Sequence, residues 1–155
     1  MLTYFPKFEL SPYPAEPQVR NIPRMPKKST PSVLVVDDEA LIRWSLAEML
    51  GERGFAVTEA PDARSALAAV AQADAPFDVV LLDYRLPDSG DLRLLEQMRR
   101  LTPGTQVIMI TAHNSPELAQ GAAALGAYSV LSKPFEVESL AALVHQALRD
   151  AVKVL

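Results

Sequence analysis

Five short apolar segments alternate with five stretches of helical periodicity after residue 32, and this alternation constrains the fold more than any other feature. The expected strands cover residues 33–36, 55–59, 78–82, 106–110 and 128–131. The expected helices, with their caps, cover residues 40–53, 62–73, 89–101, 115–126 and 137–152. This alternation predicts an α/β domain whose parallel sheet is covered on both faces. The natural candidate is a doubly wound five-stranded parallel sheet of order 2-1-3-4-5.

The composition excludes several classes of protein. The 155 residues are 49% hydrophobic and 22% charged, which is typical of a single globular domain. The net charge of −4 gives no support for direct nucleic-acid binding through a basic surface. There is no cysteine, which excludes disulfides and thiolate metal sites. No apolar run approaches the roughly 20 residues that span a bilayer, and no signal-peptide pattern is present, so we expect a cytoplasmic protein without membrane contact.

The first 32 residues differ from the rest of the chain. Seven of the 13 prolines fall within the first 31 residues, together with five Lys or Arg and two Glu. Proline fixes φ and removes a hydrogen-bond donor, so residues 1–32 are expected to form an extended or disordered arm. The arm is either a tail without a function or a docking segment that uses its aromatic residues. Residues 33–150 then form the folded domain, and residues 151–155 are the C-terminal end.

Polar residues follow four of the predicted strands at the point where each strand ends. Asp37 and Asp38 follow the first strand, Asp83 the third, Thr111 the fourth and Lys133 the fifth. Because parallel strands end at one edge of a sheet, these side chains are expected to converge. Clustered carboxylates repel one another, and oxygen-only ligands suit Mg²⁺ or Mn²⁺. A lysine and a hydroxyl can donate to phosphoryl oxygens, so the pattern predicts a magnesium-dependent phosphoryl site with a carboxylate nucleophile.

Each of these residues also has an ordinary explanation when it is taken alone. Asp83 could be a turn residue, the Asp37–Asp38 pair a helix N-terminus, and Lys133 a solvated surface residue. Their joint placement at four strand ends favours the functional interpretation. A phosphohydrolase that forms an aspartyl-phosphate would require a D-x-D motif after the first strand. This chain has Asp-Asp-Glu there, which argues against that class of enzyme.

Four motifs carry a resemblance to a known family. The segments VLVVDDE, VVLLDYRLP, VIMITAH and VLSKPF occur in this order between residues 33 and 148. In this region the chain resembles the receiver domain of bacterial two-component response regulators. The sequence around the motifs is similar to that of the NtrC-type subfamily. The resemblance implies a flavodoxin-like (βα)5 receiver fold and a phosphorelay signalling module rather than an enzyme.

The resemblance also implies a role for each acid. Asp83 would accept a phosphoryl group from a phosphohistidine on a sensor histidine kinase or a phosphotransfer protein. Asp38 would ligate Mg²⁺ directly, Asp37 would do so through water, and Asp83 and the backbone carbonyl of Arg85 would complete the protein ligands. These roles make Asp83 both the acceptor and a metal ligand.

The remaining implied roles concern the phosphoryl oxygens and the switch. Lys133 would pair with one phosphoryl oxygen, and its peptide bond to Pro134 is expected to be cis. Thr111 would bind another oxygen and move inward on phosphorylation. The fourth helix, fifth strand and fifth helix usually form the homodimer or partner face in this family.

Two positions depart from the family pattern. Val130 stands where receivers usually have Tyr or Phe, and Tyr128, two residues earlier, is expected on the same strand face by alternation. Asp91 stands where a glycine is common, so the loop after Pro87 is expected to take a shifted path and to add negative charge. These departures keep open an alternative function, that of a pseudo-receiver that binds a protein without phosphorylation.

The sequence contains no output module that we can identify. There is no GxxxxGK[ST] motif, and few residues follow the last predicted helix. The chain is therefore expected to be either a stand-alone receiver or the N-terminal piece of a longer regulator.

Overall fold

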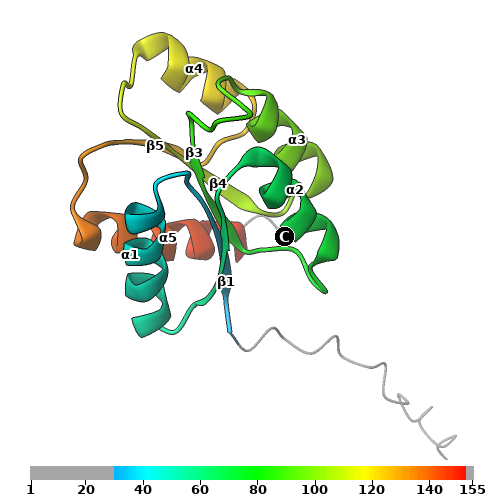
Figure 1. The fold of residues 1–155 in the computed structure, drawn as a ribbon, viewed down its shortest axis with the longest axis vertical. Coiled ribbons are helices and arrows are strands. Elements are labelled where there is room, and N and C mark those ends of the chain that lie inside the picture. The colour runs from blue at the N-terminus through cyan, green and yellow to red at the C-terminus, as the bar shows by residue number, and fades with distance from the viewer. Residues whose placement is uncertain (1–29, 153–155) are drawn as a thin grey trace, which may run out of the picture.

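The computed structural model describes residues 30–152 and contains one five-stranded parallel sheet (Figure 1). The strands are β1 (Ser32–Val36), β2 (Ala56–Ala60), β3 (Val79–Asp83), β4 (Gln106–Thr111) and β5 (Ser129–Ser132). Their spatial order is β2-β1-β3-β4-β5, which confirms the predicted doubly wound topology. The expectation for the N-terminal arm concerns residues that lie almost entirely outside the described part of the chain.

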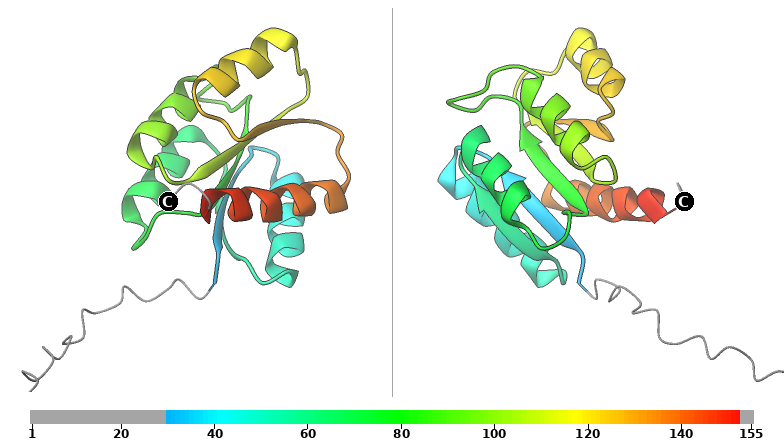
Figure 2. Two further views of the ribbon diagram at one scale, coloured as in Figure 1. Left: turned by 180° about the vertical axis from the view of Figure 1, so that it is seen from behind. Right: turned by 90° about the vertical axis from the view of Figure 1, so that its right-hand side faces the viewer.

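Five helices cover the two faces of the sheet. They are α1 (Ala40–Glu52), α2 (Ala63–Gln72), α3 (Arg93–Leu101), α4 (Pro116–Ala124) and α5 (Val137–Val152). Helices α1 and α5 lie on one face, and α2, α3 and α4 lie on the other (Figure 2). Within residues 30–152, no helix is both long enough and apolar enough to cross a membrane.

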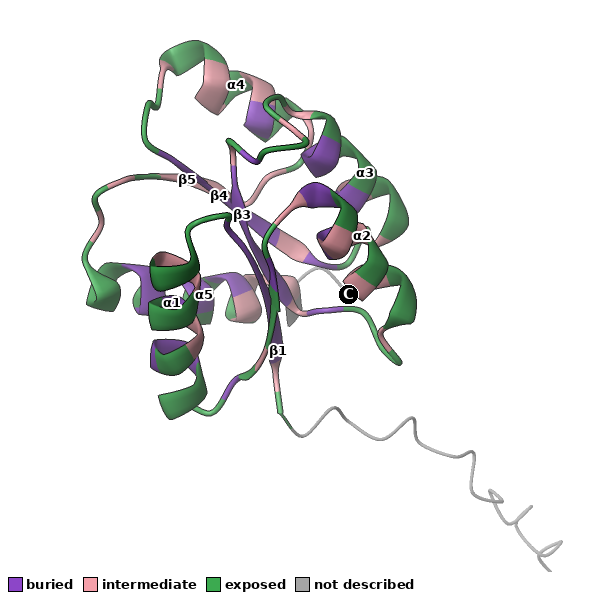
Figure 3. Ribbon diagram, in the orientation of Figure 1, coloured by how far each residue is buried: buried purple, intermediate pink, exposed green. Residues whose placement is uncertain are grey.

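The core consists of two apolar clusters, one on each side of the sheet. Leu34, Val80 and Met98 belong to the cluster under α2 and α3, whereas Val35 and Leu140 belong to the cluster under α1 and α5. Every residue of β1 and β3 is buried, because both strands are central and covered on both faces (Figure 3). The edge strand β2 is mostly exposed. The residues that follow β1 and β3 are therefore attached to buried, rigid strands.

Helix α3 begins at Arg93, four residues after the predicted start at Ser89. The predicted start was wrong because residues 86–89 form a tight turn. The Leu86 N–H donates to the Ser89 carbonyl at 2.8 Å, and the Ser89 N–H donates back at 3.2 Å. Leu86 is buried, so the turn is fixed to the core.

The register of the sheet decides which residues meet at its carboxyl edge. Val36 is paired with Leu82, so Asp37 and Asp83 come at the same level of neighbouring strands. Asp83 is paired with Ile110, and Thr111 with Ser132, the residue before Lys133. The four strand ends therefore place their polar residues along one edge.

Candidate functional site

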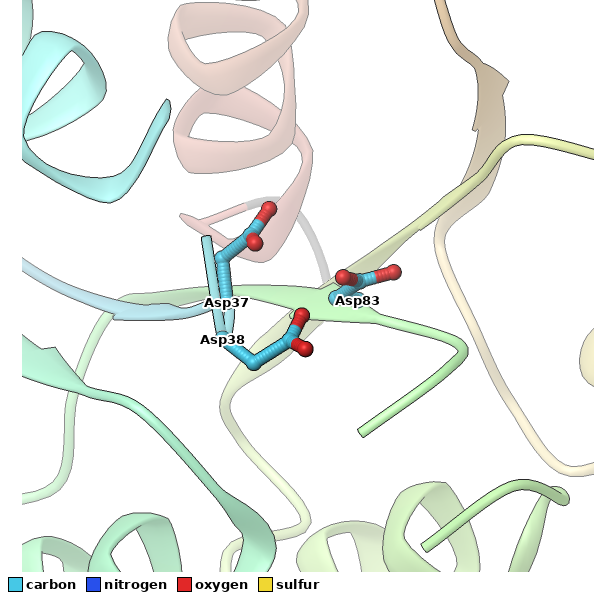
Figure 4. Close-up of side chains that lie close together, drawn as sticks. All are labelled: Asp37, Asp38 and Asp83. Atoms are coloured by element: carbon cyan, nitrogen blue, oxygen red, sulfur yellow. The ribbon is translucent and has the colours of Figure 1, made fainter. Parts of the chain in front are cut away.

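Three carboxylates gather at the ends of β1 and β3 (Figure 4). One oxygen from each of Asp37, Asp38 and Asp83 lies within 4.8 Å of the others. Asp37 and Asp83 are buried, whereas Asp38 is exposed. Such oxygen-only donors fit a hard divalent cation such as Mg²⁺, which leaves part of its coordination shell to water or phosphate.

Lys133 bridges two of these carboxylates from the end of β5. Its Nζ lies 3.1 Å from Asp37 Oδ2 and 3.4 Å from Asp83 Oδ2, and a third acid, Glu39, is 3.6 Å away. The peptide bond between Lys133 and Pro134 is cis, as expected. The ammonium group is therefore held beside the carboxylate that follows β3.

The electrostatics of Asp83 reflect its crowded position. Burial, followed by the charge of Asp37, raises the pKa of the Asp83 carboxyl from 3.8 to about 6, although Lys133 acts in the opposite direction. Burial acts to lower the pKa of Lys133, but the carboxylates of Asp37 and Asp83 outweigh it and raise that pKa. The charge of Asp37 thus disfavours the ionised form of Asp83, and a divalent cation would relieve this repulsion.

The loop after β1 is fixed by Arg43 of α1. Its Nη1 donates to the Asp37 carbonyl at 2.7 Å, and its Nε lies 3.3 Å from Glu59 Oε1 on β2. Asp37 Oδ1 also accepts the Glu39 N–H at 2.8 Å. Nothing in the sequence around Arg43 indicates this role, because it depends on contacts with the Asp37 carbonyl and with Glu59 on another strand.

Thr111 and Arg85 complete the cleft. Both line a cavity of about 230 Å³ together with Asp38, Asp83 and Lys133. Thr111 is buried, and its Oγ1 accepts the His113 N–H at 3.1 Å. The Arg85 N–H donates to Asp83 Oδ1 at 3.3 Å. All six residues that the sequence nominated for the site thus lie at one edge of the sheet.

The expectation that Tyr128 shares a face with Val130 is wrong. Val130 packs against the cluster under α2 and α3, whereas Tyr128 packs against the cluster under α1 and α5. Strand β5 begins only at Ser129, so the alternation of a strand does not extend to Tyr128. The Tyr128 hydroxyl donates instead to Asp150 Oδ2 of α5 at 2.5 Å. Tyr128 therefore cannot replace an aromatic ring at position 130.

Asp91 does not line the cleft. Its Oδ1 accepts the Arg93 N–H at 2.9 Å, and its Oδ2 lies 3.1 Å from Arg93 Nε. It lines a separate groove between α2 and the loop after β3, together with Asp88. The sequence around Asp88 does not indicate its role either, because its hydrogen-bond partners lie 24 and 25 residues earlier.

Comparison with known proteins gives a consistent result. The family model of the response regulator receiver domain matches residues 33–145. The nitrogen regulator NtrC of Salmonella typhimurium is 38% identical over 116 residues, which cover 75% of this chain and 24% of that protein. FixJ of Bradyrhizobium diazoefficiens is 35% identical over 77% of this chain and 57% of its own length. This chain thus spans about a quarter of the NtrC relatives that it matches.

Solved structures show the same architecture. The receiver domain protein of Methanospirillum hungatei superposes with a TM-score of 0.77 at 30% identity, over 82% of this chain and all of that one. The receiver domain of NtrX from Brucella abortus superposes with a TM-score of 0.68 at 37% identity, over 76% of this chain and 98% of that one. The similarity to these two structures therefore extends over at least three quarters of the chain.

Proposed function

The chain belongs to the response regulator receiver domain family, and from this premise we propose that residues 33–150 accept a phosphoryl group on Asp83 in a two-component phosphorelay. The observation that carries the proposal is the placement of Lys133 beside the carboxylates of Asp37 and Asp83. The donor is a phosphohistidine on a sensor histidine kinase or a phosphotransfer protein. Phosphorylation then alters the surface that the chain offers to a partner.

The side chains of the cleft suit this transfer. An Asp83 oxygen attacks phosphorus while the bond from phosphorus to the imidazole nitrogen breaks, and the leaving imidazole takes up a proton. With a pKa of about 6, Asp83 is mostly ionised at neutral pH and can act as a nucleophile. Lys133 Nζ and the Thr111 hydroxyl are two donors that the cleft offers to the phosphoryl oxygens.

We propose that Mg²⁺, or Mn²⁺ in its place, binds the acidic cluster. Asp38, Asp83 and the Arg85 carbonyl would be direct ligands, and Asp37 would bind through water. The metal supplies positive charge that stabilises the transferring phosphoryl group. The oxygen-only donor set and the exposure of Asp38 support this assignment.

The chemical nature of the product tests the proposal. Phosphoryl transfer from a phosphohistidine kinase should give a product that hydroxylamine cleaves, because an acyl phosphate reacts with this nucleophile and a phosphoserine or phosphothreonine does not. Asp83→Asn should abolish labelling, whereas Asp74→Asn, at an exposed position before β3, should not. A hydroxylamine-stable label, or a label that survives Asp83→Asn, would refute Asp83 as the acceptor.

We propose that the donor protein docks on an apolar surface beside the cleft. Leu41 and Trp44 of α1 and Val137 of α5 are 74%, 57% and 46% exposed. Leu41 and Val137 line a groove of about 570 Å³, and this groove shares Ala112 and Lys133 with the cleft. Exposed apolar side chains around a groove are typical of protein contact surfaces.

Two phosphodonors of different size separate docking from chemistry. Leu41→Ser should slow transfer from a kinase that phosphorylates the native chain, but it should leave the rate with acetyl phosphate unchanged. The matched control is Leu101→Ser, because Leu101 is also exposed, at 59%, but lies at the end of α3. Equal slowing with both donors would contradict the docking surface.

Val130 favours a second candidate function, that of a pseudo-receiver that binds a partner without phosphorylation. The half-buried valine offers no ring that could move with Thr111, so a phosphorylation signal would have to leave the site by another route.

We propose that any homodimer uses the α4-β5-α5 face. Dimerisation that is equal with and without phosphorylation, measured by sedimentation, would favour the pseudo-receiver.

A further inference from the structure

Asp88 makes an unusual contact between the loop after Asp83 and the start of α2. Its Oδ1 accepts the Ala63 N–H at 2.8 Å, and its Oδ2 accepts the Arg64 N–H at 3.0 Å. Both amides belong to the first turn of α2, whose N–H groups have no partner within the helix. A carboxylate is favoured there because the helix dipole places positive charge at the N-terminus.

Helix α2 already has a cap of its own. Asp62 is the N-cap residue, and its Oδ1 accepts the Ser65 N–H at 2.8 Å, with Ser65 completing a capping box. Two carboxylates therefore satisfy successive amides of the same turn. Asp62 is adjacent to the helix in sequence, whereas Asp88 reaches it from a different loop. The distinct consequence of Asp88 is that it ties that loop to α2.

The contact between Asp88 and α2 holds a short and rigid segment of the loop, residues 86–89. Residues 86–89 form the tight turn described above, and buried Leu86 fixes one side of it to the core. Asp88 fixes the outer side of the turn to α2. Arg85 comes directly before the turn, and its N–H donates to Asp83 Oδ1 at 3.3 Å. The backbone of Arg85 is thus held between the end of β3 and a turn that is anchored at two points.

We propose that Asp88 is a positioning residue for the metal site. By binding the first turn of α2, it holds the loop in the path that presents the Arg85 carbonyl to the cation. The inference rests on the proposed function, in which this carbonyl is a ligand. Asp88 does not line the cleft itself, so its effect on the cation is transmitted through the backbone of residues 85–88. It also makes the position of this loop depend on the position of α2.

The chain offers a matched control for this proposal. Asp88→Ala and Asp62→Ala each remove a carboxylate from the N-terminus of α2, but only Asp88→Ala releases the loop. Mg²⁺ affinity is measured by isothermal titration calorimetry without a phosphodonor. Amide hydrogen exchange of residues 84–90 is measured by mass spectrometry in EDTA. Asp88→Asn, which keeps one acceptor oxygen, is a milder variant in case the alanine variant unfolds.

Asp88→Ala should weaken Mg²⁺ binding about 10-fold, as is typical when a supporting residue behind a metal ligand is removed. It should also speed exchange in residues 84–90, and Asp88→Asn should have a smaller effect on both measurements. Asp62→Ala should leave both unchanged. Native Mg²⁺ affinity in Asp88→Ala, or equal weakening in Asp62→Ala, would overturn the proposal.

The two measurements also separate this inference from the proposed function. If the native chain binds no Mg²⁺, the proposed metal site fails, whatever Asp88 does. Exchange in EDTA then still decides whether Asp88 holds the loop, because that measurement needs no metal. Unchanged exchange in Asp88→Ala would refute the tie even if the native chain binds Mg²⁺ well.

Discussion

The raised pKa of Asp83 predicts that Asp83→Asn stabilises the metal-free protein. The Asp83 carboxyl has a pKa of about 6 in the folded protein and an ordinary value of 3.8. Because the folded state holds this proton more tightly, the contribution of Asp83 to stability is complete below pH 3.8 and is lost as the pH rises through 6. A difference of about two pKa units corresponds to about 3 kcal/mol at neutral pH. Asparagine is neutral and nearly isosteric, so it avoids this loss.

Urea unfolding in EDTA at a series of pH values measures the effect. The free energy of unfolding of Asp83→Asn, minus that of the native chain, should increase by up to about 3 kcal/mol between pH 4 and pH 8. Asp74→Asn is the control and should shift stability by less than about 0.5 kcal/mol, because Asp74 is exposed and precedes the start of β3, whereas Asp83 is at the other end of that strand. Parallel pH profiles for the native chain and Asp83→Asn would refute the electrostatic reasoning.

Magnesium should reduce this difference in stability. A ligand at 100 times its dissociation constant stabilises a folded protein by about 2.7 kcal/mol. The native chain should gain this stability at pH 8, and Asp83→Asn should gain less because it lacks one ligand. Equal gains in both proteins would show that the cation binds elsewhere.

Two further substitutions test the packing around the sheet, both by urea unfolding. Gly126→Ala should destabilise the protein by about 1–2 kcal/mol, because Gly126 has φ +90° and an added Cβ would lie 2.8 Å from Arg99 Nε. The control is Gly104→Ala, which should be close to neutral because an added Cβ there meets nothing within 4 Å. Tyr128→Phe should lower the urea midpoint, because it removes the hydrogen bond to Asp150. Equal effects of the two alanine variants, or an unchanged midpoint for Tyr128→Phe, would show that these contacts contribute nothing.

The sequence was most informative where local pattern and buried position agree. The apolar runs of β1 and β3 were recognisable because central parallel strands are buried on both faces. The Asp62 and Ser115 caps also marked the starts of α2 and α4 correctly. The strand order then followed from topology, and with it the convergence of Asp37, Asp83 and Lys133.

The errors and omissions arose where tertiary contacts decide the local structure. The late start of α3 depends on the turn at residues 86–89, whose buried leucine is fixed by the core rather than by its neighbours in sequence. Tyr128 was assigned to the wrong face because the start of β5 is set by its pairing with β4. Arg43 and Asp88 carry no local signal, since their partners lie on other segments.

The central claim is that Asp83 accepts a phosphoryl group with the help of a divalent cation. The most direct measurement is the intact mass of the chain after incubation with acetyl phosphate, in Mg²⁺ and in EDTA, beside Asp83→Asn. We expect one phosphoryl adduct on the native chain in Mg²⁺, and none in EDTA or on the variant. No adduct in Mg²⁺ over a range of times and donor concentrations, or an adduct that persists in Asp83→Asn, would contradict it.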